Sequence, residues 1–192
     1  MVFQSPCLLP WLSARGNVQL AADRVNRAAS SNVDARWYLD LVGVGDAADQ
    51  LPGEFSLGTQ QCVSLARALS LEPRFLLLDE PFSMLDSLTR FELQERCWTF
   101  GRNTRTVVMV THDIDEALYL ADRLILMTHG PEAGVGETLA VPFPRPRRRA
   151  AVLAQPDYHA CRRRVLDFLN HHARQARTSA IDDLLRARRL NP

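Results

Sequence analysis

Lysine is absent from this sequence of 192 residues, and all 23 of its basic side chains are arginine. A phosphate loop of the pattern G-x-x-x-x-G-K-[ST] needs that lysine, so no segment of the chain can be such a loop. Gly53 and Gly58 have the spacing of its two glycines, but Thr59 stands where lysine is required. These residues therefore contain no cradle of that type for phosphate groups.

Cysteine and long apolar stretches are also scarce. The four cysteines stand far apart without a C-x-x-C pair, which is typical of reduced thiols in a cytoplasmic protein. Cys161, His171 and His172 match no structural zinc spacing, so we assign no such metal. No apolar run approaches the ~18 residues of a membrane span, and the start has none of the features of a secretion signal. We expect a cytoplasmic protein whose 46% hydrophobic composition fills a core.

Charge is balanced overall, at +1, but unevenly distributed. Residues 1–144 carry 11 arginines against 18 acidic residues, and residues 145–192 carry 12 against 4. A basic tail can bind nucleic acid. However, this tail lacks aromatic platforms and has helically spaced Val165, Leu166 and Leu169, which favour the solvated face of a packing helix. We therefore predict no nucleic-acid partner, and a salt-dependent affinity for DNA would support the alternative.

Predicted helices and strands alternate along the chain. The periodicity indicates helices over 13–29, 33–45, 56–73, 87–102 and 114–122, and buried strands over 75–80, 106–113 and 123–128. After a turn-rich break at 129–137, "TLAVPF" favours one more strand. Alternation of this kind predicts an α/β fold in which helices cover a parallel sheet.

Domain boundaries follow from composition. Residues 1–141 are expected to form the main domain, with an all-helical subdomain near 13–70. The segment "PFPRPRRR" is too rich in proline to continue a helix or sheet, so 142–156 is predicted to be a linker. Residues 157–192 are predicted to form a helical C-terminal extension of two arginine-rich helices.

The segment "RFLLLDEPFSMLD" (74–86) has the strongest chemical pattern. Asp79 and Glu80 follow a buried strand, at the edge where α/β sheets bind ligands. Since neighbouring side chains of a strand point to opposite faces, one carboxylate can hold Mg²⁺ while the other faces an attacking water. A solvated strand end is the alternative explanation.

Two further positions are candidates. His112 ends the next strand, where it could reach a γ-phosphate, although a histidine after a strand is more often structural. Ser56 and Gly58 stand at a predicted helix N-terminus, where backbone N–H groups and the helix dipole favour a phosphate. The simpler alternative is that Ser56 only caps the helix.

The order of these motifs resembles the nucleotide-binding domain of ABC transporters over residues 1–145. "VFQ", "FSLG", "LLLDEP", "SMLD" and "VTHD" stand in the family's order and spacing. The stretches "SPCLLPWLSARGNV" and "THDIDEALYLADRLILM" look most like the nitrate/sulfonate/taurine importer branch. The matches are Gln4 (Q-loop), Ser56–Thr59 (signature), Asp79 (Walker B), Glu80 (catalytic glutamate), Ser83–Asp86 (D-loop) and His112 (switch).

The resemblance implies a P-loop NTPase-like fold that uses ATP and Mg²⁺. Glu80 and His112 would be catalytic, and Asp79 and Gln4 would hold the metal. It also implies a second ATP-binding subunit and transmembrane permease subunits as partners, with the protein peripheral on the inner face of the membrane. The residues implied to bind nucleotide are Gln4, Ser56, Gly58, Asp79 and Asp86.

The sequence departs from the family at its start and in its signature. The family's phosphate loop lies upstream of the Q-loop, and nothing precedes Met1 here, so we expect an N-terminally truncated subunit whose isolated chain is inactive. Leu57 replaces a glycine and Cys62 replaces the usual arginine, which should weaken the signature site. The alternative function is a non-catalytic fragment that docks on a complete ATPase partner or a permease.

Overall fold

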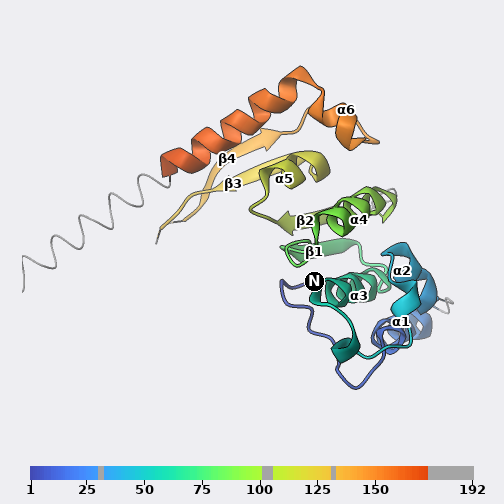
Figure 1. The fold of residues 1–192 in the computed structure, drawn as a ribbon. Helices are drawn as coiled ribbons and strands as arrows, with labels where there is room; N and C mark the ends of the chain where they lie inside the picture. The colour runs from blue at the N-terminus through green and yellow to red at the C-terminus, as the bar shows by residue number, and fades with distance from the viewer. Residues whose placement is uncertain (30–32, 101–105, 131–132, 173–192) are drawn as a thin grey trace, which may run out of the picture. The chain divides into compact units, whose positions relative to one another are not determined.

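The computed structural model describes residues 1–29, 33–100, 106–130 and 133–172 (Figure 1). The chain divides into two compact units, Met1–His112 and Asp113–Pro192, and each is taken by itself below. No described helix is long and apolar enough to cross a lipid bilayer. The predicted domain boundaries at 141 and 156 stay a prediction.

A parallel arrangement of three chain segments organises the first unit. Strands β1 (Phe75–Asp79) and β2 (Thr106–Val110) pair in parallel, as the sequence predicted. Val2 lies on the other side of β1, where its N–H donates to Leu77 O at 2.8 Å and its carbonyl accepts from the Asp79 N–H at 3.0 Å. Because parallel strands end at the same edge, the residues that follow Val2, β1 and β2 come together there.

Three helices pack against one another in the same unit, with α4 (Ser87–Phe100) following β1 (Figure 1). They are α1 (Ala14–Ala29), α2 (Ala35–Leu41) and α3 (Leu57–Leu69), with short 3₁₀ turns at Gly45–Ala47 and Pro52–Glu54. Polar caps start them: Ser13, Asp34 and Ser56 each accept a backbone N–H from the first turn of the helix that follows. Helix α2 ends at Leu41, and the chain then turns at Gly43, which has a positive φ of 82°.

Strand β1 is buried on one face, whereas β2 is exposed or half-exposed along its whole length, with Val107 47% exposed. Leu76 and Leu78 are buried in the core. On the opposite face, Phe75 is 71% exposed and Val108 is 53% exposed. The prediction of strands buried on both faces is therefore wrong for these residues, because no described element of the first unit covers that second face.

The second unit contains an antiparallel hairpin instead of a continuation of the parallel sheet. After α5 (Ile114–Leu120), β3 (Arg123–Met127) pairs antiparallel with β4 (Val135–Ala140). The turn between the strands is short, and only antiparallel strands can be joined in that way. The alternation of apolar runs and helices predicted a parallel sheet, but it does not show which strands pair or in which direction. The prediction is therefore wrong for β3 and β4.

Helical structure follows the hairpin. Helix α6 (Arg149–Leu153) lies inside the segment predicted to be a linker, and a second helix covers 156–172. This helix packs on β4: a Cβ added to Gly136 would lie 2.5 Å from the ring of Phe168. The first predicted tail helix is thus present. The second falls at 173–190, outside the described residues.

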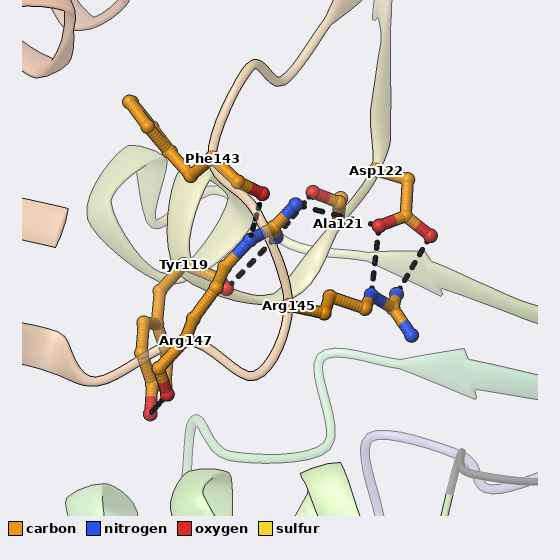
Figure 2. A network of polar contacts seen from close by, with 6 residues as sticks. All are labelled: Tyr119, Ala121, Asp122, Phe143, Arg145 and Arg147. Atoms are coloured by element: carbon orange, nitrogen blue, oxygen red, sulfur yellow. Dashed lines mark hydrogen bonds and ion pairs between the residues drawn. The ribbon is translucent and has the colours of Figure 1, made fainter.

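Arg147 is a deeply buried charged group of the second unit, with a side chain that is 1% exposed. Its guanidinium donates to the carbonyl oxygens of Phe143 (2.9 Å), Tyr119 (3.0 Å) and Ala121 (2.6 Å), and it also contacts Asp122 (Figure 2). Burial lowers the pKa of this arginine, but the four oxygen partners hold the charge in place. One side chain thereby joins the end of α5 to the segment after the hairpin.

Asp115 joins the helix at 156–172 to the first turn of α5. Its carboxylate accepts from the Tyr158 hydroxyl at 2.6 Å and from Arg162 Nε at 2.8 Å. Arg164 pairs in the same way with Glu137. Two arginines of the basic tail therefore pair with carboxylates of this chain, which agrees with the expected packing helix.

We expect the second unit to lose stability as the pH rises from about 10 to about 12. Burial, followed by the hydrogen bond to Asp115, raises the pKa of Tyr158 to about 12, above its ordinary value near 10. A raised folded-state pKa contributes stability that is complete below the unfolded value and is lost as the pH passes the folded one. Thermal unfolding of wild type and Tyr158→Phe between pH 8 and pH 12 measures this contribution.

The Phe variant should be less stable at neutral pH by about 1–2 kcal/mol, because a hydrogen bond to a carboxylate is lost. Its alkaline decline should be smaller than that of wild type. Tyr38→Phe, in the first unit, is the matched control and should leave the alkaline decline of the second unit intact. Equal declines in wild type and Tyr158→Phe would contradict the assignment.

Candidate functional site

Glu80 lies at the centre of the edge where the parallel segments end. One carboxylate oxygen is 3.0 Å from His112 Nδ1, and the other accepts from Gln4 Nε2 at 3.3 Å. The Glu80 side chain is 24% exposed, whereas that of His112 is 77% exposed. The structure thus brings together three of the predicted site residues, from the ends of three different segments.

The backbone of Glu80 is held in a conformation that few residues adopt. Its φ is 43°, in the left-handed region, which costs of order 1 kcal/mol for a residue other than glycine. Its N–H donates to Val110 O at 2.9 Å, and its carbonyl accepts from the Ser83 N–H and hydroxyl. These bonds fix the turn that aims the carboxylate at His112.

Asp79 ends β1 one residue earlier and is half-buried. Its N–H is bound to the carbonyl of Val2, so the strand end beside Gln4 is fixed. No described cluster of three or more His, Cys, Asp or Glu side chains is placed to hold a metal. Mg²⁺, however, is commonly bound through one or two protein oxygens, together with water and substrate phosphates. Asp79 and the Gln4 amide oxygen are of the right chemical kind for such a site.

The signature and D-loop segments contact each other. Ser56 caps α3 by accepting the Thr59 N–H at 3.1 Å. A Cβ on Gly58 would lie 3.2 Å from both Leu85 Cδ2 and Met84 O, so the glycine allows close contact between α3 and the loop before α4. In this arrangement the first turn of α3 begins beside the D-loop.

Asp86 caps α4, with its Oδ1 accepting the N–H groups of Leu88 and Thr89. Hydrogen bonds from Thr89, first from its side chain and then from its backbone, lower the pKa of Asp86. This cap explains the position of Asp86 without a nucleotide, and its predicted role in nucleotide binding stays a prediction.

Two departures in the signature region have visible consequences. Leu57 is 58% exposed at the first position of α3, so its branched side chain stands at the surface where the resemblance led us to expect a glycine. Cys62 is fully buried, and burial raises the pKa of its thiol to about 11. The thiol is therefore neutral at physiological pH and is not a reactive group.

Sequence patterns missed the side chains that hold the Q-loop backbone. Gln61 Nε2 donates to Phe3 O at 3.0 Å, and Arg67 Nη1 donates to Cys7 O at 3.0 Å. The buried Asn17 side chain binds both the N–H and the carbonyl of Leu9. The only signal in the sequence was that these polar residues stand within the apolar faces of helices. This signal does not tell which backbone group each side chain binds.

Comparisons with known proteins place these residues in a family. A model described as "ABC transporter" matches residues 1–83. The bicarbonate transport ATP-binding protein CmpD of Synechocystis sp. is 48% identical over 173 residues, which are 88% of this chain and 61% of CmpD. The nitrate import ATP-binding protein NrtD of Synechococcus elongatus is 47% identical over 173 residues, 88% of this chain and 63% of NrtD. The chain thus spans about three fifths of the length of these relatives.

Solved structures agree with the sequence comparison. The dimeric post-hydrolysis structure of the ATP-binding cassette MJ0796, bound to ADP and Pi, matches with a TM-score of 0.65 and 32% identity. The match covers 74% of this chain and 62% of that one. Fold and sequence both lead to one assignment: the chain belongs to the ABC transporter family of ATP-binding proteins.

Proposed function

We propose that these residues are the part of an importer's ATP-binding subunit that runs from the Q-loop onward, and that the importer carries a small oxyanion such as nitrate or bicarbonate. The convergence of Gln4, Glu80 and His112 at one sheet edge is the main support. The names of the relatives CmpD and NrtD, which describe bicarbonate transport and nitrate import, support the solute class. An organosulfur solute is the less supported member of the predicted class.

The carboxylate of Glu80 is suited to orient and deprotonate an attacking water, because it is mostly buried and His112 and Gln4 fix both of its oxygens. The exposed imidazole of His112 can reach a terminal phosphate beside that water. Asp79 and Gln4 would hold Mg²⁺, which would neutralise charge on the phosphates when bound.

The 192 residues contain no lysine, so the lysine that cradles the phosphates must come from sequence outside them. We therefore propose that ATP turnover requires an N-terminal segment with the family's phosphate loop. The exposed second face of the β1–β2 sheet supports this proposal, because such a segment would also cover Phe75 and Val108.

We further propose that the subunit works as a dimer on the cytoplasmic face of the membrane, bound to permease subunits. The capped N-terminus of α3 beside the D-loop would face the second subunit's nucleotide. The exposed Trp11 suits contact with a permease, since it is 71% exposed in the loop that follows Gln4.

Transport in cells tests the proposal. The chain would be fused to a phosphate-loop segment taken from a relative such as CmpD, and this fusion protein would be expressed in cells that lack their own nitrate or bicarbonate ATP-binding subunit. We expect uptake of nitrate or bicarbonate to return with the fusion protein and not with its Glu80→Gln variant. A fusion protein that hydrolyses ATP but restores neither solute would contradict the proposed solute class.

The alternative function, docking on a complete ATPase partner without turnover, is supported by the well-formed cap of α3. It predicts that the 192-residue chain binds a complete CmpD-type subunit and lowers its ATPase rate. Co-sedimentation at increasing chain concentration measures this binding, and an absence of binding at tens of micromolar would exclude this role.

A further inference from the structure

A side chain of the signature helix holds the Q-loop on the N-terminal side of Gln4. Gln61 lies on α3, and its side chain is buried, with 1% of the residue exposed. Its amide nitrogen donates to Phe3 O at 3.0 Å, whereas no described group donates to its Oε1. The contact joins residues 58 positions apart in the sequence.

A second tether from the same helix lies on the other side of Gln4. The Arg67 guanidinium donates to Cys7 O at 3.0 Å and to Pro6 O at 3.4 Å. Cys7 has a φ of 47°, so the backbone turns sharply where Arg67 holds it. Gln4 therefore lies on a short span of chain whose two ends are bound to α3.

The span between these tethers decides whether Gln4 reaches Glu80. Val2 is bound to β1, and only Phe3 separates it from Gln4. The Gln4–Glu80 distance of 3.3 Å is near the upper limit for a hydrogen bond, so a small displacement of the Phe3 carbonyl would break it. A shift of α3 that moved this carbonyl would therefore change the contact.

We propose that Gln61 is a positioning residue that transmits the position of the signature helix to Gln4 and so controls the contact between Gln4 and Glu80. This inference rests on the proposed function in one respect only: that a changed contact between Gln4 and Glu80 would change ATP turnover. Ser56 is the N-cap of helix α3, and the regular hydrogen bonding of the helix makes Ser56 and Gln61 move together. A displacement at the signature end is therefore carried to the Q-loop.

The half-satisfied amide supports a specific role for Gln61. A buried carbonyl oxygen without a donor is destabilising, and methionine would fill similar space without that cost. Glutamine at this position is therefore unfavourable for packing alone. Its amide N–H₂ contributes the one bond that an apolar residue cannot make, which is the bond to Phe3.

The test is an NMR comparison that needs no enzymatic activity. Gln61→Met removes the donor and keeps the length of the side chain. Gln60→Met is the matched control, since Gln60 is the adjacent residue and its Nε2 binds Pro52 O instead of the Q-loop. The measured quantity is the chemical shift of the Gln4 side-chain amide. The Glu80→Ala variant gives the chemical shift of this amide when the Glu80 carboxylate is absent.

In Gln61→Met, the Gln4 side-chain resonance should move at least halfway toward its position in Glu80→Ala. In Gln60→Met it should stay at the wild-type position. A Gln4 resonance that stays in place in a folded Gln61→Met protein would overturn the proposal. Because no nucleotide is used, this failure is distinct from a failure of the proposed function.

A wild-type measurement keeps the proposal testable if Gln61→Met does not fold. Urea would be added below the unfolding transition, with the methyl groups of the buried Leu65 as the marker of intact packing. The side-chain amides of Gln4 and Gln61 should shift together over the same urea range. A shift of Gln4 while Gln61 remains unchanged would overturn the proposal.

Discussion

The 192-residue chain is expected to show no ATP hydrolysis above a protein-free blank, and the fusion protein that carries a phosphate loop is expected to hydrolyse ATP. In the fusion protein, Glu80→Gln should lower kcat by about 10²–10⁴-fold, because the proposed general base is removed while the hydrogen bonds at its position are largely kept. Steady-state phosphate release at saturating MgATP measures both effects.

The predicted inactivity has an electrostatic cause. Asp79 and Glu80 are adjacent carboxylates at the edge where a nucleotide's phosphates would lie. Without backbone N–H groups and a cation to surround the phosphates, these carboxylates repel a polyanion. In other enzymes, the loss of a single hydrogen-bond donor that stabilises the transition state lowers kcat by about 10²–10³-fold. The loss of the whole set of groups that surround the phosphates should therefore abolish measurable turnover.

The control for this experiment is Glu92→Gln, an exposed carboxylate on α4. It changes the net charge by the same amount as Glu80→Gln and should leave kcat of the fusion protein within twofold. Turnover by the 192-residue chain that disappears in Glu80→Gln would contradict the requirement for a phosphate loop.

Local sequence signals predicted the helices and strands well, and they failed where pairing depends on distant contacts. Ser13, Ser56 and Asp113 start helices through their own side chains, so the sequence contains that information locally. The antiparallel pairing of β3 with β4 does not follow from periodicity, since β3 has the same apolar character as β1.

The candidate site was predictable as a set of residue types but not as a set of contacts. The order of motifs gave Gln4, Glu80 and His112, and the parallel strand ends explain why they meet. The sequence did not indicate the positive φ of Glu80 or the hydrogen bond from Gln61 to the Phe3 carbonyl, because both depend on segments that are far apart in the chain. Such tethers become visible only when the fold is known.

Arg147→Met is expected to destabilise the second unit by about 3–5 kcal/mol, the largest stability effect among these predictions. Methionine would fill the space of the side chain but would leave the carbonyls of Phe143, Tyr119 and Ala121 without their donor. Arg147→Lys keeps the charge but has no planar fork, so it should lose part of this stability.

Amide hydrogen exchange measures the loss directly, because the Val141 N–H bonds to Asp122 O beside the guanidinium. Its exchange should accelerate by about 10²- to 4 × 10³-fold in Arg147→Met, which is the expected stability loss converted at 1.4 kcal/mol per factor of ten. The exposed neighbour is the matched control: Arg148→Met removes an equal charge and should leave this exchange rate nearly unchanged, since Arg148 makes no side-chain capping bond to α6. Equal acceleration in both variants would mean that net charge, rather than the buried hydrogen bonds of Arg147, stabilises the second unit.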